Sequence, residues 1–79
     1  MYAAELFFKN SYDLKHFSDK INLYHDLEIY LVSGIYTMNA HSIIGVLSLD
    51  ISKPVQIQVL SENIPEAFLE DIKPFLYDF

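Results

Sequence analysis

Alternating apolar and polar positions mark four short stretches of the chain. A period of two residues is typical of a β-strand that buries one face. It is clearest in residues 55–59, where two glutamines alternate with Val55, Ile57 and Val59. The same pattern predicts strands at residues 2–8, 27–32 and 35–38. Ser33 and Gly34 lie between the second and third of these and can form the tight turn of a hairpin.

Residues 11–24 carry apolar side chains at the spacing of an amphipathic helix. The predicted buried face comprises Leu14, Phe17, Ile21 and Tyr24. Asn10 and Asp13 stand at the start of this stretch, in an arrangement that can cap the first turn of a helix. We therefore expect a helix over residues 11–24.

A second capping pattern precedes the last predicted helix. Asn63 and Glu66 have the same spacing, and the apolar stripe that follows comprises Ala67, Phe68 and Ile72. Pro74 disfavours helical geometry in the residue before it, so the helix should stop or kink at Lys73. Residues 75–79 form an apolar tail whose conformation the pattern leaves open.

A short helix is also expected between the third and fourth strands. Ser42 is a typical N-cap residue, and it precedes an apolar run that comprises Ile43, Ile44, Val46, Leu47 and Leu49. We expect the first turn of this helix to be open and its body to be buried. Gly45 interrupts the run although glycine lowers helix propensity by about 1 kcal/mol relative to alanine. Its presence indicates close packing or a partner at that point.

The element order βαββαβα predicts an α+β fold. Four strands can form one antiparallel sheet in the order 1-4-2-3, with three helices on a single face, in a two-layer open-faced β-sandwich. The other sheet face would stay uncovered and carry Glu5, Phe7, Tyr30, Val32, Gln56 and Gln58. We expect residues 1–79 to form a single domain.

Composition narrows the classes of function. The chain is 52% hydrophobic and 15% aromatic and has no cysteine, so it should fold without a disulfide or a metal, in a reducing compartment. We expect no cofactor. A net charge of −6 and the absence of arginine make nucleic acid an unsuitable partner. No apolar run is long enough for a membrane span and no basic region precedes an apolar N-terminus, so we expect a cytoplasmic protein without a signal peptide.

The stretch from Asn39 to Leu49, NAHSIIGVLSL, resembles the run that introduces the second helix in one bacterial family. This is the histidine-containing phosphocarrier family (HPr) of the sugar phosphotransferase system. The resemblance is ungapped, and it extends back to Asp26 and forward through the fourth strand. It implies the fold and the element order predicted above.

The same resemblance implies that the family's own reaction is lost. Family members carry a phosphoryl group on a histidine at the start of the first helix, and an arginine steadies it. The ungapped register places Ser11 at the histidine and Asp13 at the arginine. An aspartate there puts negative charge where a phosphoryl group would need a donor. His16 is an alternative carrier, but it lies more than a turn into the predicted helix, away from free backbone amides.

The resemblance also implies a regulatory role for Ser42. In Gram-positive members the matching serine is phosphorylated by an HPr kinase, and the product acts with a transcriptional regulator. The apolar patch on which family partners dock would here comprise Ile43, Ile44 and Leu47. The plainer alternative is that Ser42 only caps the helix and the isoleucines belong to the core. His41 stands where the family has a lysine.

The sequence offers little for catalysis. It has no nucleophile–base pairing and no glycine-rich phosphate loop, so we do not expect an enzyme. An acidic, solvated surface on the last helix comprises Glu62, Glu66, Glu70 and Asp71. The three histidines, His16, His25 and His41, lack metal-ligand spacing.

Our working hypothesis is an HPr-like regulatory or protein-interaction module. Two alternatives remain open. One is a phosphocarrier that uses His16. The other is a homodimerising module that uses the open sheet face or the tail at residues 75–79.

Overall fold

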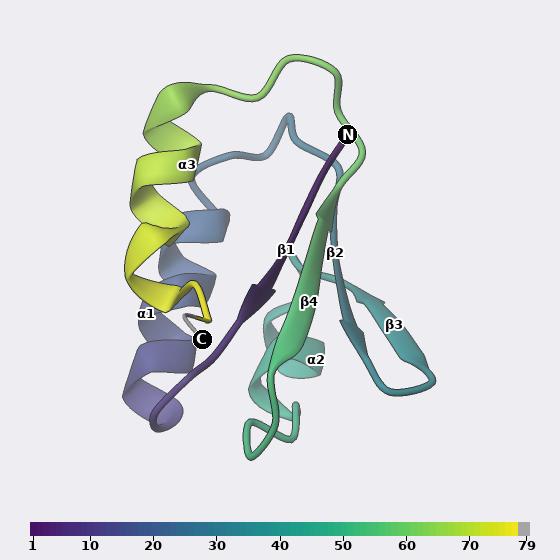
Figure 1. Cartoon of the computed structure of the whole chain (residues 1–79), viewed down its shortest axis with the longest axis vertical. Coiled ribbons are helices and arrows are strands. Elements are labelled where there is room, and N and C mark those ends of the chain that lie inside the picture. Colours follow the sequence, from purple (N-terminus) through teal and green to yellow (C-terminus); the bar gives the residue numbers. More distant parts are fainter. Residues whose placement is uncertain (78–79) are drawn as a thin grey trace.

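A four-stranded antiparallel sheet with helices packed on one face makes up the computed structural model, which describes residues 1–77 (Figure 1). The strand order β1-β4-β2-β3 and the helical layer confirm the predicted fold. The elements are β1 (Tyr2–Leu6), α1 (Ser11–Ile21), β2 (Ile29–Ser33), β3 (Tyr36–Asn39), α2 (Ile43–Leu47), β4 (Val55–Val59), α3 (Glu66–Ile72) and the 3₁₀ turn η1 (Lys73–Phe75).

The predicted buried faces of the strands are confirmed. β4 lies at the centre of the sheet, and its alternate residues Val55, Ile57 and Val59 are fully buried. In the register of the sheet, Ile57 pairs with Leu31 of β2, which is also fully buried. Gly34 adopts a positive φ of 60° in the hairpin turn, a conformation in which glycine has no steric cost. The hairpin is confirmed, but its turn comprises Gly34 and Ile35 instead of Ser33 and Gly34, because Ser33 still belongs to β2 and pairs with Tyr36.

The other face of the sheet is open to solvent, as predicted. Glu5, Phe7 and Gln56 are exposed there, and Tyr30, Val32 and Gln58 are half-buried. Polar side chains on this face bond to one another: the amide of Gln58 donates to Gln56 at 3.0 Å, and the hydroxyl of Tyr30 donates to Glu28 at 3.0 Å. The bond to Glu28 raises the pKa of Tyr30 above its usual value, because ionisation would place two negative charges side by side.

Two predicted elements end earlier than the pattern indicated. β1 ends at Leu6 rather than residue 8, and α1 ends at Ile21 rather than Tyr24. After Asn22 the helical bonds are replaced by shorter ones, because the N–H groups of Leu23 and Tyr24 donate only three residues back. The side-chain amide of Asn22 also donates to the carbonyl of Ser18. Tyr24 still packs on the core from the following loop, and the centre of its ring lies 5.2 Å from the centre of the Phe68 ring. Tyr24 thus contributes to the core, as its spacing predicted, but it does so from outside the helix.

The prediction that Asn63 caps the last helix is wrong. The N-cap of α3 is Pro65, which makes no side-chain capping bond, and the helix begins at Glu66. Proline disfavours helical geometry in the residue before it, so Ile64 cannot begin a helix capped by Asn63, and α3 begins at Glu66. Ala67 is exposed, whereas Phe68 and Ile72 are fully buried. α3 ends directly before Lys73, close to the predicted stop.

The segment after α3 returns to the sheet and covers the outer edge of β1 (Figure 1). The N–H of Phe7 donates to the carbonyl of Phe75, and the N–H of Tyr77 donates to that of Glu5, each at 2.8 Å. Phe75 is buried in the core, and the centre of its ring lies 5.6 Å from the centre of the Phe17 ring. The tail up to Tyr77 therefore completes the core and one sheet edge, and residues 78–79 lie outside the described residues.

The first turn of α2 is open, as predicted, but the prediction that the body of the helix is buried holds only for Val46. Val46 is its only buried residue; Ile43, Ile44 and Leu47 are exposed, and Leu49, just beyond the helix, is half-buried. A helix of five residues makes little more than one turn, so only one of its side chains can point directly into the core. α2 rests against α1 and β3, and its remaining surface faces solvent.

Candidate functional site

Ser42 occupies the N-cap position of α2, as predicted. Its backbone is extended, and its exposed side-chain oxygen accepts a hydrogen bond from the N–H of Gly45 at 3.4 Å. Its carbonyl accepts from Val46 at 2.9 Å, and its own N–H donates to Asn39 at 3.0 Å. The serine is thus held at the start of the helix by its backbone, while its hydroxyl remains accessible from solvent.

Gly45 is explained by close packing against this hydroxyl. A Cβ atom at position 45 would lie 3.1 Å from the Oγ of Ser42 and 3.7 Å from the Sδ of Met38. The first distance is shorter than an ordinary van der Waals contact, and the second is an ordinary contact. Glycine therefore leaves room for the capping side chain, as the sequence indicated.

Three large apolar side chains lie on the solvent-facing side of α2. Ile43 is 54% exposed, Ile44 86% and Leu47 51%. We call these three side chains, which lie beside Ser42, the α2 patch. Isolated exposed apolar residues are common on soluble proteins, but here three of the five residues of one short helix are apolar and exposed, and they lie next to the exposed hydroxyl of Ser42. The alternative that both isoleucines belong to the core does not hold.

The start of α1 holds Ser11 and Asp13, the two residues that the resemblance aligns with the phosphocarrier motif. Ser11 is the first residue of the helix and is exposed. The side chain of Asn10 accepts from the N–H of Asp13 at 3.0 Å, and the carboxylate of Asp13 accepts from the N–H of Lys9 at 3.3 Å. The two side chains thus cap the helix reciprocally. Asp13 stabilises the start of α1 and places a negative charge in its first turn.

His16 lies on the exposed side of α1, as expected for a helix histidine. It lines a groove between α1 and the α3–η1 segment, whose other lining residues include the carboxylates of Asp13, Asp19 and Asp71. The single lysine of this groove, Lys20, pairs with Asp71 at 3.7 Å. Carboxylates repel a phosphoryl group, so these surroundings disfavour phosphate on His16.

His41 and His25 lie beside one another at the start of α2. Their ring centres are 6.3 Å apart and nearly parallel, with 24° between the planes. The Nε2 of His41 lies 2.9 Å from the carbonyl oxygen of Leu27 and therefore donates to it, while its Nδ1 is buried with no partner within residues 1–77. His41 ties the loop before α2 to the start of the hairpin. Across those same residues, no group of three potential ligands is arranged to hold a metal ion.

The prediction of a solvated acidic surface on the last helix is wrong for Asp71. Glu62, Glu66 and Glu70 are exposed, but Asp71 is half-buried and accepts a hydrogen bond from the hydroxyl of Tyr24. That bond, with a contribution from burial, raises the pKa of Tyr24 above its usual value. Asp71 thus joins α3 to the end of α1 instead of standing in solvent.

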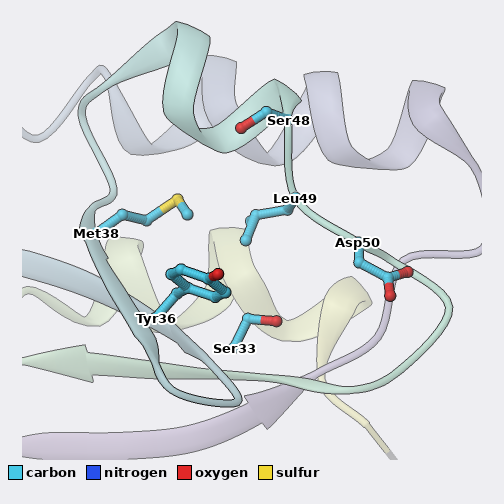
Figure 2. Close-up of a pocket in the computed structure, with 6 residues that line it drawn as sticks. All are labelled: Ser33, Tyr36, Met38, Ser48, Leu49 and Asp50. Carbon is cyan, nitrogen blue, oxygen red and sulfur yellow. The ribbon is translucent and has the colours of Figure 1, made fainter.

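A hollow of about 310 Å³ beside α2 had no signal in the sequence. It lies between the hairpin and the chain that follows α2, and Figure 2 shows its lining residues: Ser33, Tyr36, Met38, Ser48, Leu49 and Asp50. The hydroxyl and the N–H of Ser52 both donate to Asp50. These two bonds, the hydroxyl's more than the N–H's, hold the pKa of Asp50 below its usual value. Tertiary packing alone brings the hairpin and this loop together.

No protein-family model, curated protein or solved structure matches the chain. Within residues 1–77, no helix has the length and apolar character needed to cross a membrane.

Proposed function

We propose that this chain is an HPr-like protein that has lost the phosphocarrier histidine and acts as a regulatory or protein-interaction module. The observation that carries the proposal is the α2 patch, where three large apolar side chains lie in water beside the exposed Ser42. A protein partner that covered this surface would gain the free energy of removing apolar area from water.

Phosphorylation of Ser42 is the proposed means of regulation. A phosphate would add a charge of roughly −1.5 to −2 at the edge of an apolar surface. The first turn of α2 contains no acidic residue that would oppose this charge, and the serine side chain is exposed to a modifying enzyme. The modified and unmodified patches would therefore suit different partners, which we propose to be an HPr kinase and a transcriptional regulator.

Incubation with an HPr kinase and ATP tests this proposal directly. We expect a single phosphate, located on Ser42 by mass spectrometry and absent from Ser42→Ala. Ser48→Ala is the matched control, because this exposed serine lies at the opposite end of the same helix. No modification under conditions that phosphorylate an authentic family member would refute the regulatory proposal.

The patch is tested separately from the serine. Ile44→Ser and Leu47→Ser should lower kcat/KM with the kinase, since they remove apolar contact area next to the modified residue. Leu23→Ser is the control, because Leu23 is 70% exposed but lies in the loop after α1. Equal effects of all three substitutions would show that the patch has no special role.

Phosphoryl transfer from phosphoenolpyruvate and enzyme I should not occur. Ser11 and Asp13 replace the residues that the reaction needs, and His16 stands among carboxylates. Radiolabel that is incorporated into the wild type and lost in His16→Ala would establish the alternative phosphocarrier.

A homodimer through the open sheet face is the second candidate function. Phe7 and Tyr30 lie on that face, and none of the described helices covers it. The ring of Phe7 already packs against that of Tyr77, with 5.9 Å between the ring centres, so part of its surface is covered by its own chain. Sedimentation of the wild type and of Phe7→Ser/Tyr30→Ser decides the question, because an unchanged mass would reject this dimer.

A further inference from the structure

The two edges of the sheet differ in how they are covered. At the β1 edge the segment after α3 bonds to the strand, since Phe75 accepts from the N–H of Phe7 and Tyr77 donates to the carbonyl of Glu5. At the opposite edge, no segment within residues 1–77 lies outside β3 (Figure 1). An uncovered edge strand is a template on which another strand can pair, so the sheet can be extended at β3.

The register of the hairpin shows which backbone groups of β3 point outward. The N–H of Ala40 donates to the carbonyl of Ile29 at 2.9 Å, so these two residues form a hydrogen-bonded pair. Bonded and non-bonded pairs alternate along an antiparallel ladder. Tyr36 and Met38 therefore bond to β2, whereas Thr37 directs its N–H and its carbonyl away from the sheet. Across residues 1–77, these two groups of Thr37 form no bond with another segment.

The uncovered edge belongs to an uncharged part of an acidic chain. The net charge is −6, yet residues 29–49 contain no aspartate, glutamate, lysine or arginine. Edge strands that resist pairing often carry a lysine or a proline, and β3 has neither. A second copy of the chain would therefore meet no like charge along β3, whereas the acidic remainder of the chain would repel it.

We propose that two copies of this chain pair in antiparallel fashion through β3, with a two-fold axis at Thr37. The N–H of each Thr37 donates to the carbonyl of the other, so the outward groups satisfy one another. The two threonine side chains meet on the open face of the sheet, as a favourable cross-strand pair. The two four-stranded sheets then form one continuous sheet of eight strands.

The side chains beside the axis also complement each other. Met38 pairs in register with the buried Leu31, so Met38 and Tyr36 lie on the helix-covered face of β3. Pairing centred on Thr37 places Tyr36 of each copy opposite Met38 of the other. Tyr36 is 69% exposed and would be covered, and sulfur atoms contact aromatic rings favourably. The same strand supplies both halves of the contact, which favours a second copy over an unrelated strand.

Sedimentation velocity of the wild type from micromolar to millimolar concentration is the first test. A contact between two strands of four residues should bury less than the roughly 1,200 Å² of most stable complexes. We therefore expect a dissociation constant on the order of 0.1–1 mM. Added salt should strengthen association, because it screens the repulsion between two copies of charge −6. A wild type that stays monomeric at several millimolar would overturn the proposal.

Charge exchange at Thr37 tests the register of the pairing. Thr37 is exposed, so Thr37→Lys and Thr37→Glu should fold, yet each places two like charges at the axis and should abolish association. An equimolar mixture of the two variants should associate at least about tenfold more tightly than either alone. Gln56→Lys is the control, because Gln56 is exposed on the open face in the inner strand β4 and should not affect association. Association that Thr37→Lys leaves intact would refute the pairing.

Cysteine cross-linking separates this edge from the open sheet face. The chain has no cysteine, and a bonded pair at the axis has Cα atoms about 5.5 Å apart, within the range of a disulfide. Thr37→Cys should therefore form a covalent dimer on mild oxidation. Val32→Cys should not, because Val32 pairs with Thr37 from one strand further in and would lie about 14 Å from its copy. Cross-linking of Val32→Cys in place of Thr37→Cys would assign any dimer to the open face and overturn the proposal. The pairing residues belong to β3 and not to the α2 patch, so that outcome leaves the proposed regulation at Ser42 unaffected.

Discussion

The contact between Gly45 and the Ser42 hydroxyl can be tested by replacing the glycine with alanine. Alanine is favoured over glycine in a helix by about 1 kcal/mol. In this chain its Cβ would lie 3.1 Å from the capping oxygen, which must move aside. A serine cap contributes about 0.5–2 kcal/mol, and the long bond of 3.4 Å places this one near the lower end.

These terms oppose each other in the wild-type background. We expect Gly45→Ala to stabilise the protein by at most about 0.5 kcal/mol, because the gain in helix propensity is partly offset by the displaced cap. In a Ser42→Ala background no capping oxygen remains. The new Cβ then meets the Cβ of residue 42 at 3.5 Å and the Sδ of Met38 at 3.7 Å, both ordinary contact distances. There the same substitution should stabilise by about 1 kcal/mol.

Urea unfolding of the four proteins, followed by far-ultraviolet circular dichroism, measures this coupling. The difference between the two backgrounds should be about 0.5–1 kcal/mol, which is within reach of a double-mutant cycle. Phe68→Leu in both backgrounds is a control, since this core position in α3 should not couple to Ser42. Equal stabilisation by Gly45→Ala in the two backgrounds would refute the packing explanation.

Three further predictions concern the helices and the titrating groups. Val46→Ala should destabilise the fold by about 2 kcal/mol and Ile44→Ala by less than about 0.5 kcal/mol in urea unfolding, because only Val46 is buried. The raised pKa of Tyr24 means that stability falls as pH rises above about 10, the pKa of an unperturbed tyrosine, toward its folded value. The urea midpoint of Tyr24→Phe should fall less over that range. The lowered pKa of Asp50 contributes stability that is lost as pH falls below about 4. Ser52→Ala should raise this pKa in a carboxyl NMR titration, and an unchanged value would contradict the assigned hydrogen bonds.

The strands were the most predictable part of the fold. Their side chains alternate between two faces, so a short run such as Val55, Ile57 and Val59 identifies the buried face without knowledge of the neighbouring strand. Caps and turns were also local. Asn10 binds an amide three residues away, and Gly34 needs only its own backbone freedom.

Helix ends and the exposure of α2 were less predictable. Tyr24 has helical spacing yet lies outside α1, because the helical hydrogen bonds stop at Asn22 and Asp71 of a distant element binds the tyrosine. Asn63 has the right spacing for a cap, but Pro65 sets where α3 begins. The motif around Ser42 predicted the cap and the open first turn of α2 correctly, but it misjudged Leu47, which is exposed.

The sequence by itself determined the strand faces, the presence of a hairpin at Gly34 and the cap at Ser42, because each depends on residues within a few positions of one another. Tertiary structure alone decided which side of α2 meets solvent, since that depends on how α1 and β3 cover a single turn. It also decided that residues 75–77 close the edge of β1 and that Tyr36 and Asp50 share one hollow. Both arrangements join segments far apart in the chain, and no local pattern of side chains encodes such a meeting.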